Sequence, residues 1–221
     1  MNIVENITKI KSELPERVKL VAVSKTKPNE DIMQAYNGGH KIFGENKVQD
    51  LVNKYETLPK DIEWHFIGHL QSNKVKYIVP FVSLIHAVDS LKLLKIINKE
   101  GGKINRKINC LLQMHIAEEE TKFGLSFDEI NKILDSEEYS QTEFVKITGL
   151  MGMATNTNDT AQIHKEFAYL KSCFEKTKVG YFKNDENFTN LSMGMSGDYK
   201  IAAEEGSTMI RVGSLIFGAR G

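Results

Sequence analysis

Short apolar runs alternate with amphipathic helical patterns along the chain, and this alternation limits the possible folds more than any other feature. There are eight such strand-and-helix units of about 25 residues, with no second run of strands and no low-complexity linker. They predict an α/β protein: a single closed (β/α)8 TIM barrel that forms one domain over residues 1–221. The expected strands are a run that ends near residue 24, then 40–44, 62–68, 84–88, 108–116, 146–152, 190–195 and 208–213.

Helical patterns fill the gaps between these runs. An amphipathic segment from Ile3 to Leu14 precedes the first strand and predicts an extra N-terminal helix. An open doubly wound sheet is the alternative fold, but it needs a glycine-rich turn after the first strand, and residues 24–27 contain no glycine. The other expected helices are 29–36, 45–55, one through 75 and 78 that Pro80 closes, one capped by Ser90 that runs to 101, 127–134, 161–174 and 199–205.

Charge and composition exclude several classes of function. Lysine plus arginine and aspartate plus glutamate each number 29, and no dense basic run marks a nucleic-acid or membrane partner. The first residues lack a signal-peptide pattern, and no apolar stretch is long enough to span a bilayer, so we expect a cytoplasmic protein, and we expect it to be a monomer. Cys110 and Cys173 lie among apolar neighbours and are expected to be buried structural thiols.

Lys25 ends the first apolar run, in the sequence 21–28. A short β-branched run closed by turn residues predicts a buried strand, so Lys25 is expected at its C-terminal tip, where barrels of this class place their chemistry. Lys27 falls in the connecting loop, since it precedes Pro28, which suits a helix start. A partly desolvated lysine can lose its proton and attack an aldehyde. The alternative is an ordinary charge at the rim of a strand.

The sequence 192–198 predicts a cradle for a phosphate group. Gly197 allows backbone N–H groups to approach an anion, Ser196 adds a hydroxyl donor, and the following helix start adds partial positive charge. Loops after the seventh and eighth strands form the usual phosphate site of such barrels. An ordinary helix N-cap at Ser196-Gly197-Asp198 is the alternative.

The last strand contains Arg211 in an otherwise apolar run. A guanidinium in a buried strand needs an acceptor, which could be a ligand atom or, as the alternative, the carboxylate of Glu204 or Glu205. Gly213 and Ser214 follow and could donate further hydrogen bonds to a phosphate.

Histidines near the third strand are weaker candidates. His65 is expected to be a satisfied core histidine, whereas His69, Asn73 and Asn46 lie where contacts around a ligand could form. The six histidines show no metal-ligand spacing, so no metal is expected.

Six stretches carry a joint resemblance: 22–28, 43–46, 64–74, 150–153, 191–198 and 211–218. Taken together they resemble the pyridoxal phosphate homeostasis protein family. The resemblance implies a barrel like the N-terminal domain of alanine racemase, with pyridoxal 5′-phosphate (PLP) held as an internal aldimine, a Schiff base, on Lys25. It implies that Arg211 faces the pyridine nitrogen. The residues expected around the phosphate are Ser196, Gly197, Gly213 and Ser214, and Asn46 and Met195 complete the expected cofactor site.

The resemblance also implies a function, because family members are regarded as proteins that bind and buffer the cofactor without an established reaction. We therefore expect intracellular PLP homeostasis rather than catalysis, with PLP-dependent apoenzymes as partners. A guanidinium at the ring nitrogen leaves that nitrogen unprotonated and weakens the ring as an electron sink. The alternative is a PLP-dependent racemase-like enzyme. Racemisation needs an opposing acid or base, which related racemases take from another domain, and we expect no such domain here.

Overall fold

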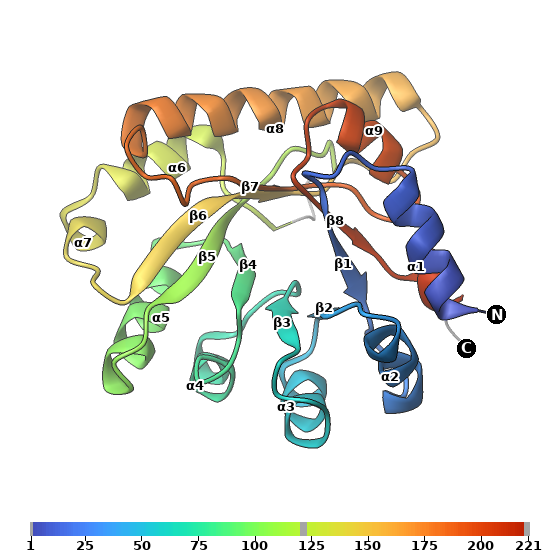
Figure 1. Cartoon of the computed structure of the whole chain (residues 1–221). Coiled ribbons are helices and arrows are strands. Elements are labelled where there is room, and N and C mark those ends of the chain that lie inside the picture. Colours follow the sequence, from blue (N-terminus) through green and yellow to red (C-terminus); the bar gives the residue numbers. More distant parts are fainter. Residues whose placement is uncertain (1, 120–122, 219–221) are drawn as a thin grey trace.

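Eight parallel strands close on themselves in sequence order, and the last one pairs with the first. This computed structural model describes residues 2–119 and 123–218. Figure 1 shows the strands surrounded by helices, and the closed strand order confirms the expected (β/α)8 barrel. The strands are β1 (Lys19–Val23), β2 (Ile42–Glu45), β3 (Glu63–Phe66), β4 (Leu84–Val88), β5 (Ile108–Met114), β6 (Val145–Gly152), β7 (Asn190–Ser192) and β8 (Met209–Val212).

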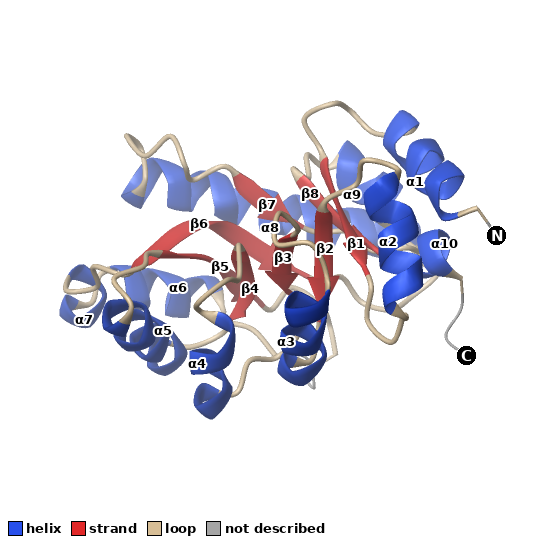
Figure 2. Cartoon of the chain, turned by 60° about the horizontal axis from the view of Figure 1, so that its bottom comes forward, coloured by secondary structure: helices blue, strands red, loops and turns tan. Residues whose placement is uncertain are grey.

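Helices form the outer layer, which Figure 2 shows in blue around the red strands. The expected N-terminal helix is present as α1 (Ile3–Ser12), which buries Ile3, Ile7 and Ile10. The others are α2 (Asn29–Asn37), α3 (Val48–Thr57), the 3-10 turn η1 (Ser72–Lys74), α4 (Val75–Ile78), α5 (Leu91–Lys103), α6 (Phe127–Leu134), α7 (Glu137–Ser140), α8 (Thr160–Tyr181), α9 (Tyr199–Glu204) and α10 (Ser214–Phe217).

Helix α8 differs most from its expected length, since it continues to Tyr181 instead of ending near residue 174. Its last turns are held by Phe188, whose ring stacks on Phe174 and Phe182 with centroid distances of 5.0 and 4.4 Å. Phe188 follows the helix in the chain, so the helical periodicity alone does not reveal this contact. The four-residue helices α7 and α10 were not expected either, because one turn carries almost no periodic signal.

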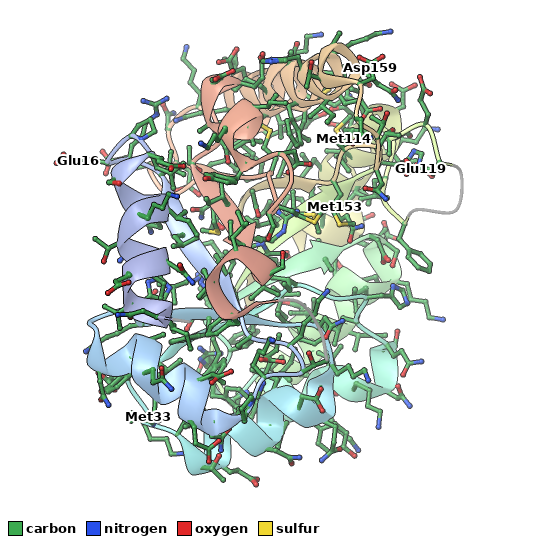
Figure 3. The ribbon with its side chains drawn as sticks, turned by 90° about the vertical axis from the view of Figure 1, so that its right-hand side faces the viewer. Glu16, Met33, Met114, Glu119, Met153 and Asp159 are labelled. Carbon is green, nitrogen blue, oxygen red and sulfur yellow. The ribbon has the colours of Figure 1, made fainter. Side chains whose placement is uncertain are left out.

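Two apolar cores lie on either side of the strands. The larger one, between barrel and helices, contains fully buried Phe43, Trp64 and Phe66. The smaller one fills the barrel, and the partly buried Met153, labelled in Figure 3, packs against it. Cys110 and Cys173 are buried, as expected. The barrel-filling residues are Val21, Leu84, Ala87, Leu111, Met151 and Met209.

Strand pairing brings the carboxyl ends of four strands together. β1 pairs with both β2 and β8, and β8 pairs with β7, so the loops that follow these strands lie together on one side of the barrel mouth.

Figure 3 shows Glu16, which precedes β1, and Glu119, which follows β5, on opposite sides of the molecule. Within residues 2–119 and 123–218, no helix is long and apolar enough to cross a membrane.

Candidate functional site

Lys25 lies in the tight turn that follows β1, partly buried. The strand ends at Val23, and the N–H of Lys27 donates to the carbonyl of Ser24 at 3.0 Å across the turn. Lys25 was expected at the tip of the strand, but it lies two residues beyond the strand's last residue. The pairing of β1 with β2 and β8 ends before the turn begins. Thr26 has a φ of 65°, a left-handed conformation that costs energy in a β-branched residue and must be held by its surroundings.

The buried ion pair of Glu45 and Lys54 supports this turn through Ser24. The hydroxyl of Ser24 donates to Glu45 Oε1 at 2.5 Å, and Lys54 Nζ, from α3, donates to the same oxygen at 2.8 Å. Lys54 Nζ also donates to the carbonyl of Ser24 at 2.8 Å. Burial raises the pKa of Glu45, although the adjacent Lys54 ammonium opposes this. These groups hydrogen-bond to both the hydroxyl and the carbonyl of Ser24, the residue before Lys25. They therefore fix the backbone position from which the Lys25 side chain extends.

The loop after β7 is folded back on itself by hydrogen bonds. Gly194 has a φ of 98°, and a Cβ there would lie 2.6 Å from the Cβ of Ala202, so glycine is required. The N–H of Met195 donates to Asp198 Oδ1 at 2.5 Å. The N–H of Gly213, in the loop after β8, donates to Ser196 Oγ at 3.3 Å and ties the two loops together.

Unused backbone donors gather in these two loops. Among residues 2–119 and 123–218, no acceptor takes a hydrogen bond from the N–H groups of Ser196, Gly197, Ser214 or Leu215. Helices α9 and α10 have only six and four residues, so the expected contribution of a helix dipole is small and the individual N–H groups are the main donors. An anion with several oxygens can accept from such a set.

The glycines of the cradle differ in what they require. A Cβ at Gly197 would meet nothing within 4 Å, and its backbone does not need glycine, so the space beside it is open. A Cβ at Gly213 would lie 3.0 Å from the carbonyl oxygen of Val23, so this glycine permits close contact between the ends of β1 and β8. The open space at Gly197 is therefore available to a ligand.

Arg211 is 4% exposed and its hydrogen bonds go to neutral oxygens. Its guanidinium donates to Ser192 Oγ at 2.5 Å and to the carbonyl of Gly152 at 3.1 Å. The alternative pairing with Glu204 or Glu205 is wrong, because both carboxylates instead lie beside His164. Glu205 Oε1 is 2.7 Å from Nδ1 of that ring, and Glu204 Oε2 is 3.7 Å from Nε2. Burial lowers the pKa of Arg211 to about 10, so the buried group is still a cation at neutral pH. Among the described residues no carboxylate accepts a hydrogen bond from Arg211, although the charge of Asp198 partly offsets the effect of burial on its pKa. A buried cation in this state favours an electron-rich ligand atom.

The histidines behind Arg211 were only partly anticipated. His65 is buried as expected, and its Nδ1 lies 3.0 Å from His86 Nε2. His86 Nδ1 lies 3.0 Å from Ser192 Oγ, which also accepts from Arg211. The roles of His86 and Ser192 were missed. Their signal in the sequence is polar residues at alternate positions of otherwise apolar strands, on the side that faces the barrel interior.

The remaining candidates are Asn46, His69 and Asn73. Asn46 directly follows β2, and its backbone packs against Gly68, where a Cβ would lie 2.3 Å from the carbonyl oxygen of Asn46. His69 Nδ1 lies 3.1 Å from Asp89 Oδ2, and its ring stacks on Phe123. Asn73 lies in η1 and is exposed. No group of metal-binding side chains occurs within the part of the chain that the structure describes.

The candidate site thus draws on four neighbouring strand ends. Lys25 follows β1 and Asn46 follows β2, while Met195 and the cradle residues Ser196 and Gly197 follow β7. Arg211 belongs to β8, and Gly213 and Ser214 follow it. The arrangement offers an amine, a set of anion donors and a buried cation around one mouth.

Comparison with known proteins identifies the family of the chain. A family model described as alanine racemase, N-terminal domain, matches residues 1–221. Proteins named pyridoxal phosphate homeostasis protein from Aquifex aeolicus and Pasteurella multocida are 39% identical to the chain over 204 and 207 residues. These matches cover 91% and 92% of the chain and 87% of each relative. The chain belongs to the pyridoxal phosphate homeostasis protein family.

Solved structures give the same result. PipY of Synechococcus elongatus is 35% identical, with TM-scores of 0.91 for its structure without PLP and 0.88 for its structure with PLP bound. Both comparisons cover 98% of this chain and all of PipY. An alanine racemase of Clostridium difficile is 12% identical with a TM-score of 0.77, and the match covers 99% of this chain and 57% of the racemase. That likeness shows a shared fold.

Proposed function

We propose that this protein binds PLP in the barrel mouth and serves PLP homeostasis by holding and releasing the cofactor. The names of its relatives and the PLP bound in PipY support this function. The observation that carries it is the set of unused backbone donors beside the open space at Gly197, because a phosphate needs both.

The residues present fit the cofactor in three ways. Ser196, Gly197, Gly213 and Ser214 would hold the phosphate, and Arg211 would donate to the pyridine nitrogen. Lys25 would bond covalently to the aldehyde, with Asn46 and Met195 lining the remaining edge. When bound, PLP supplies a ring that can withdraw electrons from an attached amine.

The proposed role is that of a carrier in a single domain over residues 1–221, a monomer that exchanges cofactor with PLP-dependent apoenzymes. Arg211 supports the absence of transamination chemistry, because a guanidinium with a pKa of about 10 keeps its own proton and leaves the ring nitrogen unprotonated, which weakens the ring as an electron sink. Its neighbours Ser192 and the carbonyl of Gly152 are neutral, so they do not supply a carboxylate in its place. A racemase-like enzyme is the alternative.

Replacement of Lys25 tests the binding site. The purified wild-type protein mixed with PLP should be yellow, and borohydride should fix the cofactor on the tryptic peptide that contains Lys25. Lys25→Ala should abolish the fixed label, although the phosphate contacts still retain some cofactor without a covalent bond. The matched control is Lys27→Ala, two residues further along the same turn, which should label normally. Label on Lys27 in the wild-type protein, found by mass spectrometry, would contradict the assignment.

A deuterium experiment separates carrier from enzyme. The PLP-loaded protein incubated with L-alanine or L-serine in D2O should exchange the α-hydrogen no faster than free PLP does, as followed by proton NMR. Transfer of the cofactor to an apoenzyme should instead proceed faster than spontaneous release. Rapid α-deuteration that disappears in Lys25→Ala would establish the racemase-like alternative.

A further inference from the structure

Four buried polar side chains form a continuous line across the barrel interior. His65 of β3 contacts His86 of β4 at 3.0 Å, His86 contacts Ser192 of β7 at 3.0 Å, and Ser192 contacts Arg211 of β8 at 2.5 Å. Each of the four residues is 4% exposed or less. We call this line the Arg211 chain.

The donor chemistry gives the Arg211 chain one direction. A guanidinium only donates, so Ser192 Oγ accepts from Arg211. Within the described residues, the only other partner of Ser192 Oγ is His86 Nδ1, which therefore accepts the hydroxyl proton. His86 then carries its own proton on Nε2 and donates to His65 Nδ1. His65 must likewise carry its proton on Nε2.

The burial of both histidines agrees with these neutral forms. Burial lowers the pKa of His65 to about 3 and that of His86 well below its usual value, and the Arg211 charge lowers the pKa of His86 further. The Lys19 ammonium also lowers the pKa of His65. Neither ring therefore gains a second proton at neutral pH, and the donor direction is preserved.

The far end of the Arg211 chain reaches polar surroundings. His65 lines a cavity of about 340 Å³ at the amino ends of the strands, together with Lys19, Glu63 and Asn190, which begin β1, β3 and β7. A polar cavity of this size can hold water that accepts from the His65 N–H group. Every donor in the line then has an acceptor.

We propose that His65, His86 and Ser192 are positioning residues that hold Arg211 as a fixed donor toward a ligand in the barrel mouth. This inference rests on the proposed function for the identity of that ligand. Without the Arg211 chain, the long arginine side chain could adopt rotamers that point away from the barrel mouth. A side chain that is already fixed loses less conformational entropy when it binds a ligand.

Nitrogen-resolved NMR of the ligand-free protein tests the direction of the chain. We expect His65 and His86 to be neutral at neutral pH with the proton on Nε2 in both rings. A proton on Nδ1 of His86 would overturn the inference. This measurement needs no cofactor, so its result is independent of whether the protein serves PLP homeostasis.

Variants of His86 test the positioning role. His86→Leu removes both contacts, whereas the amide of His86→Gln can still accept from Ser192. We expect His86→Leu to lower the NMR order parameter of the Arg211 Nε–H group and to weaken PLP binding about tenfold, as loss of a hydrogen-bonded charge contact does. His86→Gln should retain the order parameter and bind within about threefold of wild type.

His40→Leu is the matched control, because His40 is a buried histidine outside the Arg211 chain whose Nε2 contacts the carbonyl of Ile42. It should change neither the Arg211 order parameter nor PLP binding. If His86→Leu leaves the order parameter at its wild-type value, or if His86→Gln and His86→Leu lower it equally, the positioning role is wrong. A wild-type protein that binds no PLP would instead contradict the proposed function, while the order parameters still decide this inference.

Discussion

Gly197→Val should weaken PLP binding by about 100-fold, because a side chain in the open space beside Gly197 displaces the phosphate from at least two charge-assisted hydrogen bonds of about 1.5–3 kcal/mol each. The structure supports this, since a Cβ at Gly197 meets no protein atom within 4 Å and the variant should fold normally. Binding can be measured by titration of the PLP absorption band. Pyridoxal, which lacks the phosphate, should bind Gly197→Val and wild type equally.

Gly180→Val is the matched control for this substitution. Gly180 lies in α8 and also has no atom within 4 Å of an added Cβ, but it is remote in the chain from the loops after β7 and β8. PLP should bind Gly180→Val as it binds wild type. Equal affinities of wild type for PLP and pyridoxal would remove the phosphate cradle from the proposed site.

Acidification from about pH 7 to about pH 5 should destabilise the fold strongly, by up to about 1.4 kcal/mol per pH unit for each histidine that stays neutral when folded. Three histidines are buried: burial lowers the pKa of His40 to about 4, that of His65 to about 3, and that of His86 well below its usual value. Unfolded histidine gains its proton near pH 6.5, so the unfolded state binds more protons between that pH and the folded pKa values.

The sign follows from these depressed pKa values: the stabilisation is complete above about pH 6.5 and is lost as the pH falls toward about 4 and 3. Urea denaturation at several pH values measures the slope. His40→Gln should reduce the slope by about one third, since one of three groups is removed. Added salt should leave it largely unchanged, because burial rather than surface charge causes the shifts. A stability that is flat across this window would show that these histidines are protonated in the folded protein.

The sequence predicts the barrel well because its signal is local. Each apolar run and each amphipathic helix is indicated by residues close together in the sequence. A helix cap can be predicted from a single residue, as at Ser90, whose hydroxyl accepts from the N–H of Leu93 at 3.3 Å. Strand ends are less certain. The last residue of β1 that pairs with β2 is Val23, and the last that pairs with β8 is Ala22. The partner strands therefore set the end of β1, and Lys25 lies in the turn that follows. The end of α8 depends in the same way on Phe188.

The site is predicted in kind, but its supporting contacts are not. The sequence motifs identify Lys25, Gly197 and Arg211 as candidates. In the sequence, Lys25 ends an apolar run, Gly197 lies in a Ser-Gly turn before a helix, and Arg211 is a charged residue in an apolar run. The partners of Arg211 come from β6 and β7, and the groups that hold Ser24 come from β2 and α3. Such pairings join residues far apart in sequence, and no periodicity reveals them.

The ladder between β7 and β8 has a single register pair, Ser192 with Met209, whereas β5 and β6 share seven. This seam has the fewest paired strand residues, although the N–H groups of Met193 and Arg211 also donate across it, to the carbonyl groups of Met209 and Gly194. The candidate phosphate donors lie on its two sides, at Ser196 and Ser214. An anion that accepts from both loops would act as an additional rung across this seam. Cofactor binding would then stabilise this part of the already closed barrel wall, and amide hydrogen exchange in β7 should be slower in the loaded protein than in the ligand-free protein.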